Sequence, residues 1–402
     1  MSNTQKKNVP ELRFPGFEGE YSLDIFGNLA TNKSDKFNPQ NENASIDIEL
    51  DCIEQNTGRL IKIYNSKEFS SQKNKFNPQN VLYGKLRPYL NKYYFTKKSG
   101  VCSSEIWVLK STKEDKLLNL FLYYFIQTKR YSDVASKSAG SKMPRADWGL
   151  IENIRVYFPE LCEQQKIGEF FSKLDRQIEL EEQKLELLQQ QKKCYMQKIF
   201  SQELRFKDDN GNDYPEWEEK KLGKLSQIVR GASPRPIKDP KWFNKESDIG
   251  WLRISDVTDQ NGKIYHLEQK LSIEGQEKTR VLLTTHLLLS IAASIGKPVM
   301  NFVKTGVHDG FLIFLNPKFN IFFMYYWLDY FKEKWSKYGQ PGSQVNLNSE
   351  IVKSQTLNMP SNHEQEKVGL FFSRNEKLIE LQQEKIMYLK RRKQALILKM
   401  FI

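Results

Sequence analysis

The stretch PELCEQQKIGEFFS at residues 159–172 decides the fold, because it returns as PSNHEQEKVGLFFS at residues 360–373. The two copies lie 201 positions apart and align without a gap from Phe158 to Phe200. Of the 43 residues in that alignment, 16 are identical, and further pairs change like for like. A repeat of this length indicates that the chain contains one structural unit twice.

The repeat divides the chain into shared and divergent parts. The tetrapeptide ELRF at residues 11–14 returns at 203–206, but between this motif and the repeated stretch the copies have little in common. Both divergent parts mix β-branched alternation with amphipathic segments, which is typical of α+β domains. We therefore predict four segments: a first variable domain at 1–158, a first conserved helix at 159–201, a second variable domain at 202–359 and a second conserved helix at 360–402.

Each repeated stretch has the spacing of a coiled coil. Apolar residues recur at alternating steps of four and three, from Ile167 to Ile199 in the first copy and from Val368 to Met400 in the second. This heptad predicts a coiled coil about 60 Å long, at 1.5 Å per residue. A long amphipathic helix that lies on a globular core is the alternative.

The order of charges gives the two helices a direction. Both copies are acidic early, as at Glu179 and Glu380, and basic late, as at Lys192 and Lys393. Antiparallel packing places acid beside base, whereas parallel packing would place like charges together. The predicted fold is α+β, with two similar globular domains separated by a long antiparallel two-helix coiled coil and related by a pseudo-twofold axis.

Charge and composition indicate the kind of partner. The formal net charge is +13, of which residues 160–200 carry −1 and residues 361–402 carry +4, so +10 lies outside the helices. Such a basic excess favours an acidic partner, most commonly nucleic acid. The four cysteines form no C-x-x-C pair, the N-terminus is polar, and no apolar run reaches the roughly 20 residues that span a bilayer. We expect a cytoplasmic protein.

Motifs for catalysis are missing from the sequence. There is no glycine-rich phosphate loop, and the Asn-Pro pairs do not continue into the Asn/Asp-Pro-Pro-aromatic motif of amino-methyltransferases. No Ser-His-Asp, Cys-His or carboxylate-pair arrangement stands out either. A basic chain with two similar domains and no such motif favours recognition over catalysis.

The motif P-x-x-x-EQQKI begins at Pro159 and returns as P-x-x-x-EQEKV at Pro360. With these motifs the chain resembles the specificity subunit of a type I restriction-modification enzyme, and the resemblance covers nearly the whole chain. Support comes from YGKLRPYL at 83–90 with CSSE at 102–105, and from RGASP at 230–234 with Trp251 and SIGK at 294–297. Glu366 stands in the second copy where the first has Gln165.

The resemblance implies a division of labour among subunits. Each variable domain would be a target recognition domain for one half of an asymmetric DNA site, and the helices would set the spacer and dock two modification subunits. Those subunits would hold S-adenosylmethionine for adenine methylation, and restriction subunits would use ATP and Mg. No cofactor is expected in this chain, which would be non-catalytic.

The candidate DNA-binding residues are basic or polar groups near glycine and proline turns, because phosphates are bound by Lys and Arg and bases are read by similar side chains. In the first domain they are Lys85, Arg87, Tyr89, Lys92, Ser141, Lys142 and Arg145; in the second they are Arg230, Ser233, Arg235, Arg253, Lys297, His308, Ser343, Gln344 and Asn346. The tyrosines at 123, 124, 325 and 326 recur at helical spacing, which favours core packing over base stacking.

Two other functions remain open from the sequence. The chain could be a DNA-modifying enzyme, a nuclease or methyltransferase, with an unrecognised active site. It could also be a scaffold whose coiled coil bridges two partners without DNA. Steep salt dependence of DNA binding would separate a DNA-recognition subunit from such a scaffold, because contacts with phosphates release counterions.

Overall fold

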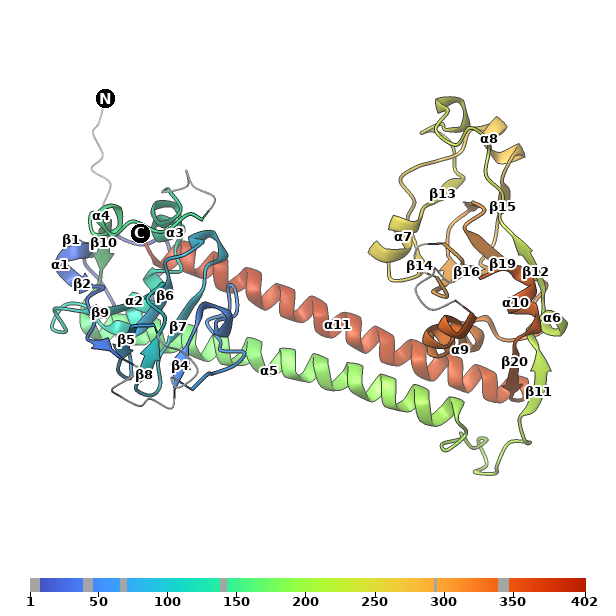
Figure 1. The fold of residues 1–402 in the computed structure, drawn as a ribbon, viewed down its shortest axis with the longest axis horizontal. Coiled ribbons are helices and arrows are strands. Elements are labelled where there is room, and N and C mark those ends of the chain that lie inside the picture. The colour runs from blue at the N-terminus through green and yellow to red at the C-terminus, as the bar shows by residue number, and fades with distance from the viewer. Residues whose placement is uncertain (1–7, 39–45, 66–70, 138–142, 293–294, 339–346) are drawn as a thin grey trace. The chain divides into compact units, whose positions relative to one another are not determined.

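The computed structural model describes residues 8–38, 46–65, 71–137, 143–292, 295–338 and 347–402 (Figure 1). The chain forms two compact units. The first contains residues up to Glu182 together with Glu384–Ile402, and the second is Gln183–Gln383. Two long helices, α5 (Leu161–Phe200) and α11 (Asn362–Met400), each contribute one half to each unit. We call the part of each unit outside these helices its head. The boundaries of the four predicted segments stay a prediction.

The first head is built from short strands and helices. Strand β1 (Ser22–Ile25) pairs with β10 (Arg155–Phe158), next to α5. One sheet has the order β2 (Ala30–Thr31), β9 (Ile106–Ser111), β6 (Val81–Gly84), β7 (Tyr93–Phe95), and a second has the order β3 (Lys36–Phe37), β5 (Lys73–Phe76), β8 (Gly100–Cys102), β4 (Asp47–Ile48). The helices are α1 (Phe26–Leu29), α2 (Asn119–Phe125), α3 (Lys129–Ala135) and α4 (Trp148–Ile151), with 3-10 turns η1 (Leu50–Cys52) and η3 (Pro88–Leu90).

The second head uses the same kinds of elements. Strand β11 (Glu218–Lys221) pairs with β20 (Thr356–Met359), next to α11. The larger sheet has the order β12 (Gln227–Arg230), β19 (Phe311–Leu315), β16 (Leu287–Ser290), β17 (Pro298–Asn301), β14 (Lys263–Ile264), and the smaller one β13 (Gly250–Leu252), β18 (Thr305–Val307), β15 (Arg280–Leu282). The helices are α6 (Leu222–Leu225), α7 (Ile254–Asp259), α8 (Ile273–Glu277), α9 (Ile321–Phe331) and α10 (Ser349–Ser354), with η4 (Pro240–Trp242) and η5 (Lys332–Tyr338).

The two heads share one topology although their sequences differ. The antiparallel run β2-β9-β6-β7 corresponds to β12-β19-β16-β17. Strand β8 pairs in parallel with β4 and antiparallel with β5, and β18 does the same with β13 and β15. The duplication seen in the helices therefore extends through both heads, and the predicted α+β class is confirmed.

The long helices pack antiparallel within each unit. In the first unit, ammonium groups of α11 meet carboxylates of α5 in reversed order, with Lys385–Glu181 at 2.5 Å and Lys393–Asp175 at 2.6 Å. In the second unit Lys192 meets Glu376 at 2.6 Å. The prediction that acidic residues of one helix face basic residues of the other is confirmed.

The heptad prediction holds along most of both helices and is wrong at Tyr195. The positions from Ile167 to Ile178 and the last ones, Ile199 and Met400, are buried as predicted. Tyr195 is exposed and its neighbour Met196 is buried instead, whereas Leu396 is half-buried beside the buried Ile397. An α-helix lags a strict heptad by about 20° per repeat. After four repeats the lag is about 80°, close to the 100° between neighbouring residues, so the next residue takes the buried position.

The repeated motifs anchor each head to its helix. The guanidinium of Arg13 donates to both carboxylate oxygens of buried Glu163 at 2.8 and 2.7 Å, and Arg205 binds Glu364 in the same way at 3.3 and 2.8 Å. The next residue accepts a backbone hydrogen bond from the head: the Gln164 side chain from the Leu118 N–H at 2.9 Å, and that of Gln365 from the Asn320 N–H at 2.8 Å. We call Arg13, Glu163 and Gln164 the first anchor.

The second anchor consists of Arg205, Glu364 and Gln365. It adds a hydrogen bond from the Trp217 indole N–H to Glu364 at 2.9 Å. Both anchor glutamates are fully buried. This explains why ELRF and EQ recur together in the sequence: the arginine of the first motif neutralises the glutamate of the second.

A tyrosine, a carboxylate and an ammonium form a further link in each unit. Tyr124 donates to Asp175 at 3.0 Å, and Lys393 binds the same carboxylate. In the second unit Tyr326 donates to Glu376 at 2.8 Å, with Lys192 and Lys263 on that carboxylate. Burial alone would raise the pKa of Glu376, but the two lysines outweigh it and hold the pKa below its usual value.

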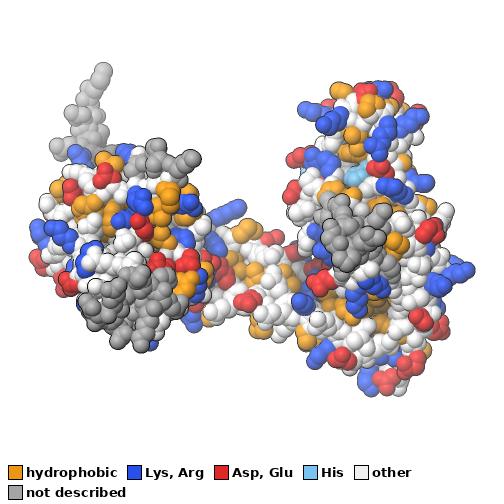
Figure 2. Space-filling model, in the orientation of Figure 1, with side chains coloured by type: hydrophobic (Ala, Val, Ile, Leu, Met, Phe, Trp, Pro, Cys, Tyr) orange, Lys and Arg blue, Asp and Glu red, His pale blue; other side chains and the backbone are white. Residues whose placement is uncertain are grey.

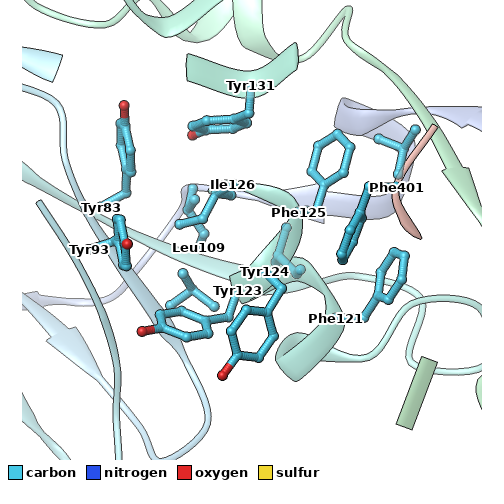
Figure 3. Close-up of a cluster of buried hydrophobic side chains, with 14 of the residues drawn as sticks. Tyr83, Tyr93, Leu109, Phe121, Tyr123, Tyr124, Phe125, Ile126, Tyr131 and Phe401 are labelled. Carbon is cyan, nitrogen blue, oxygen red and sulfur yellow. The ribbon is translucent and has the colours of Figure 1, made fainter. Parts of the chain in front are cut away.

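The aromatic residues at helical spacing form the core of each head. In the first head Tyr123 packs edge-on against both Tyr93 and Tyr124, and Phe121 packs on Phe401 (Figure 3). Tyr325 and Tyr326 are buried in the second head. The prediction of core packing for these four tyrosines is confirmed. All four cysteines are free thiols. Within the described residues, every helix is too short or too polar to cross a membrane.

Candidate nucleic-acid interface

Three segments meet at one end of the first head. They are the β6–β7 connection at 85–92, the β8–β9 turn at 103–105, and residues 143–146. The backbone N–H of Lys85 donates to the Glu105 carbonyl at 3.0 Å, and the N–H of Arg87 donates to the Pro144 carbonyl at 2.8 Å. Backbone pairing therefore brings together sequence candidates that lie almost 60 positions apart.

The predicted residues at this end differ in whether their side chains bind other groups of the head. Arg87 is exposed in a left-handed conformation with φ of 52°, and Tyr89 beside it is exposed as well. Arg145 donates to both oxygens of Glu105 at 3.0 and 3.1 Å, and this guanidinium lowers the pKa of Glu105. Lys92 instead points its ammonium at the Leu50 carbonyl, 2.5 Å away.

The corresponding end of the second head is organised around Asp309, in the turn between β18 and β19. The Ser233 hydroxyl and the Arg235 guanidinium each donate to its carboxylate at 2.8 Å. Arg230 donates to its carbonyl at 2.6 Å. Burial alone would raise the pKa of Asp309, but Ser233 and the two arginines outweigh it and hold the pKa below its usual value. We call these four residues the Asp309 cluster.

The loop that carries the cluster lies against the turn through two glycines. A Cβ on Gly231 would lie 2.1 Å from the His308 carbonyl oxygen, and one on Gly310 would lie 2.4 Å from the His308 ring. The His308 ring accepts the Gly310 N–H through Nδ1 at 2.8 Å and packs on Trp251 with 5.7 Å between ring centres. Burial lowers the pKa of His308, so the ring is neutral at pH 7.

The other candidates of the second head lie beside α7. Arg253 donates twice to Asp256, at 3.1 and 2.7 Å, at the start of that helix. Lys297 donates to the Val257 carbonyl at 3.1 Å, and burial lowers its pKa. The candidates Ser141, Lys142, Ser343, Gln344 and Asn346 lie outside the described residues. A DNA-binding role stays a prediction for every candidate.

The residues predicted from the sequence are basic, polar or aromatic, and the carboxylates that bind some of them, Glu105 and Asp309, are not among the candidates. Glu105 and Asp309 occupy the same turn of the shared topology, between β8 and β9 and between β18 and β19. Each binds an arginine from another segment: Arg145 in the first head, Arg235 in the second. The available signal was an acidic residue in a short turn between two buried strands.

The surface at these ends suits DNA, because it offers groups that can bind phosphates and groups that can contact base edges. Arginine forks match phosphate and the guanine edge, and exposed loops can enter a DNA groove. Figure 2 shows Lys and Arg side chains over the second head with Asp and Glu among them, so this surface mixes both signs of charge. Within the described residues, no group of three or more His, Cys, Asp or Glu could hold a metal ion.

Comparison with known proteins agrees with this description. The family described as "Type I restriction modification DNA specificity domain" matches the chain twice, at residues 20–190 and 214–391. The type I restriction enzyme MjaVIII specificity subunit of Methanocaldococcus jannaschii is 24% identical over 312 residues, which are 72% of this chain and 71% of that protein. The EcoDI specificity subunit of Escherichia coli is 25% identical over 169 residues, covering 40% of this chain and 37% of that one.

Solved structures share the fold at low sequence identity. The type I restriction-modification system S subunit from M. genitalium aligns with a TM-score of 0.57 and 14% identity, over 98% of this chain and 99% of that one. A chain from work on complex assembly and conformational transition of the type I R-M system aligns with a TM-score of 0.60 and 17% identity, over 94% and 96%. Together with the two family matches, which cover most of the sequence, these findings place the chain in the type I restriction-modification DNA specificity family, as a specificity subunit that carries two such domains.

Proposed function

We propose that this subunit reads an asymmetric bipartite DNA site, one half with each head. The observation that carries the proposal is that one topology is used twice while the residues at its loop ends differ. The first head has Arg87, Tyr89 and the Arg145–Glu105 pair at that end, and the second has the Asp309 cluster. Different side chains on equivalent loops would contact different bases.

The two long helices are proposed to set the spacer between the half-sites and to bind two modification subunits. Exposed apolar residues recur on them at the 201-residue offset: Leu180 with Leu381, at 49% and 48% exposure, and Leu187 with Tyr388, at 54% and 62%. Each unit holds one residue from each helix, Leu180 with Tyr388 in the first and Leu187 with Leu381 in the second. Hydrophobic side chains at the surface of the helices are visible in Figure 2. Two equivalent apolar surfaces would suit two copies of one partner.

The chemistry is proposed to reside in the partner subunits. S-adenosylmethionine would bind the modification subunits, and ATP and Mg the restriction subunits, so this chain would need no cofactor of its own. Phosphate contacts from the heads would then supply most of the DNA affinity and make it depend steeply on salt. A cytoplasmic location, where DNA is accessible, remains a prediction.

Changing the first head should alter only one half of the target. The variant Arg87→Asn with Arg145→Gln keeps a residue type that tolerates the left-handed backbone at 87 and removes two guanidiniums. We expect the complex with modification subunits to lose about tenfold or more in affinity for its site, with relaxed bases in one half-site only. Methylation-sensitive sequencing of DNA modified by the complex gives the target of each variant.

Lys113→Gln is the matched control, because Lys113 is exposed beyond the other end of β9. It should leave both half-sites unchanged. If the double variant relaxes both halves together, the assignment of one head to one half is wrong.

A further inference from the structure

Glu105 lies in the turn between β8 and β9, and Asp309 in the turn between β18 and β19. The proposed function gives neither carboxylate a contact with DNA. A carboxylate on a DNA-facing loop repels phosphates, so its presence on that surface lowers affinity unless it does something else. Stability is a weak reason for it, because exposed ion pairs such as Arg235–Asp309 contribute about 0–1 kcal/mol. Both heads nevertheless place a carboxylate in the same turn.

The arginines come from unrelated places in the two heads. Arg145 precedes α4 in the first head, whereas Arg235 follows β12 in the second. Arg145 binds the turn before β9, and Arg235 binds the corresponding turn before β19. The duplicated feature is therefore the pairing of a turn carboxylate with an arginine, and it does not follow from alignment of the two head sequences. In the second head the same aspartate also binds Ser233 and Arg230.

Such a pairing restricts an otherwise mobile side chain. An arginine loses rotamer freedom when it contacts a base, and a guanidinium already held in a plane loses less. One guanidinium has five N–H donors, so a guanidinium that gives one or two to a carboxylate keeps donors for the O6 and N7 acceptors of guanine. The neighbouring negative charge also disfavours the competing position against a phosphate.

We propose that Asp309 and Glu105 are positioning residues for sequence specificity, which orient Arg235 and Arg145 toward a guanine in the second and first half-site respectively. The inference rests on the proposed DNA-recognition function and deepens it. It predicts that each half-site contains a guanine. The preference for guanine over other bases at that position depends on a carboxylate that need not touch DNA. Removing the carboxylate should therefore weaken discrimination more than overall DNA binding.

The experiment uses the full chain assembled with its modification subunits. Asp309→Asn and Glu105→Gln are compared with wild type by methylation-sensitive sequencing and by DNA binding at several salt concentrations. We expect each variant to lose about tenfold or more of its discrimination at one guanine, in opposite half-sites, while binding to non-specific DNA is unchanged or stronger. Arg235→Ala should lose discrimination at the same position as Asp309→Asn, and the double variant should lose no more than Arg235→Ala, because both changes remove one contact.

Asp248→Asn is the matched control. Asp248 forms an exposed ion pair with Lys304 at 2.5 Å in the same head as Asp309. The variant therefore removes one negative charge, as Asp309→Asn does, but leaves the turn between β18 and β19 unchanged. It should keep wild-type specificity. Thermal unfolding of each complex checks folding, and Glu105→Gln tests the idea independently should Asp309→Asn be unstable.

The outcomes separate this inference from the proposed function. Wild-type discrimination in both carboxylate variants, or additive losses in the double variant, would overturn the positioning role while leaving DNA recognition intact. A wild-type complex without sequence-specific modification would instead overturn the proposed function.

Discussion

Replacing Arg205 with Met is expected to destabilise the second unit by about 3–5 kcal/mol, because it leaves the fully buried Glu364 without its charge partner. The remaining hydrogen bond from Trp217 cannot neutralise the carboxylate. Hydrogen exchange followed by mass spectrometry should show faster exchange at the start of α11 and in β11 and β20, which lie beside this anchor. A chemical unfolding curve of the purified complex gives the size of the effect.

The control for this variant is Lys207→Met, two residues along the same segment. Lys207 pairs with Asp213 at 3.2 Å, but both side chains are mostly exposed, so the change should stay within about 0.5 kcal/mol. Adding Glu364→Gln to Arg205→Met removes the buried charge and keeps an acceptor for Trp217, so it should recover much of the loss. Equal stability of the Arg205 and Lys207 variants would refute the role of the anchor.

Substituting the exposed apolar residues of the helices by Glu should prevent binding of modification subunits. If a partner buries Leu187 and Leu381, their loss removes about 3–6 kcal/mol, more than a hundredfold in affinity. Leu187→Glu with Leu381→Glu is expected to cost one modification subunit, and Leu180→Glu with Tyr388→Glu the other. Native mass spectrometry of the assembled complex counts the subunits that remain.

Folding should be unaffected by these changes, because the side chains are exposed. Ile273→Glu is a matched control: Ile273 is exposed and lies in α8 of the second head, outside both long helices. It should keep both modification subunits. A complex of unchanged stoichiometry in both helix variants would contradict docking on these surfaces.

The helices were predictable because their information is local and repeated. The heptad from Ile167 and the charge order set the buried face and the antiparallel direction within each unit, and the structure agrees. The error at Tyr195 has a geometric cause, since the helix lags a strict heptad by about 20° per repeat and has turned by about 80° over the four repeats from Ile167.

The loop ends of the heads were only partly predictable. Arg145 and Arg235 were found from glycine and proline turns, but their carboxylate partners lie 40 and 74 positions away in the chain. Pairings over such distances depend on the strand order of the folded head, which hydrophobic patterns do not specify. Lys92 and Lys297 show the converse: both sit in basic turns, yet backbone carbonyls within the head bind their ammonium groups.

The doubled anchor has a consequence for how this protein can evolve. An arginine, a glutamate and a glutamine attach each head to its long helix through the same contacts. A tyrosine of each head adds a second attachment, to a carboxylate that also binds a lysine of the other long helix. The segment from the ELRF motif to the EQ motif is therefore a cassette, a unit that carries the same attachment residues at its two ends in both copies. We expect recombination between related genes to exchange such cassettes as whole pieces, so that new half-sites arise without any new adaptation of the helices.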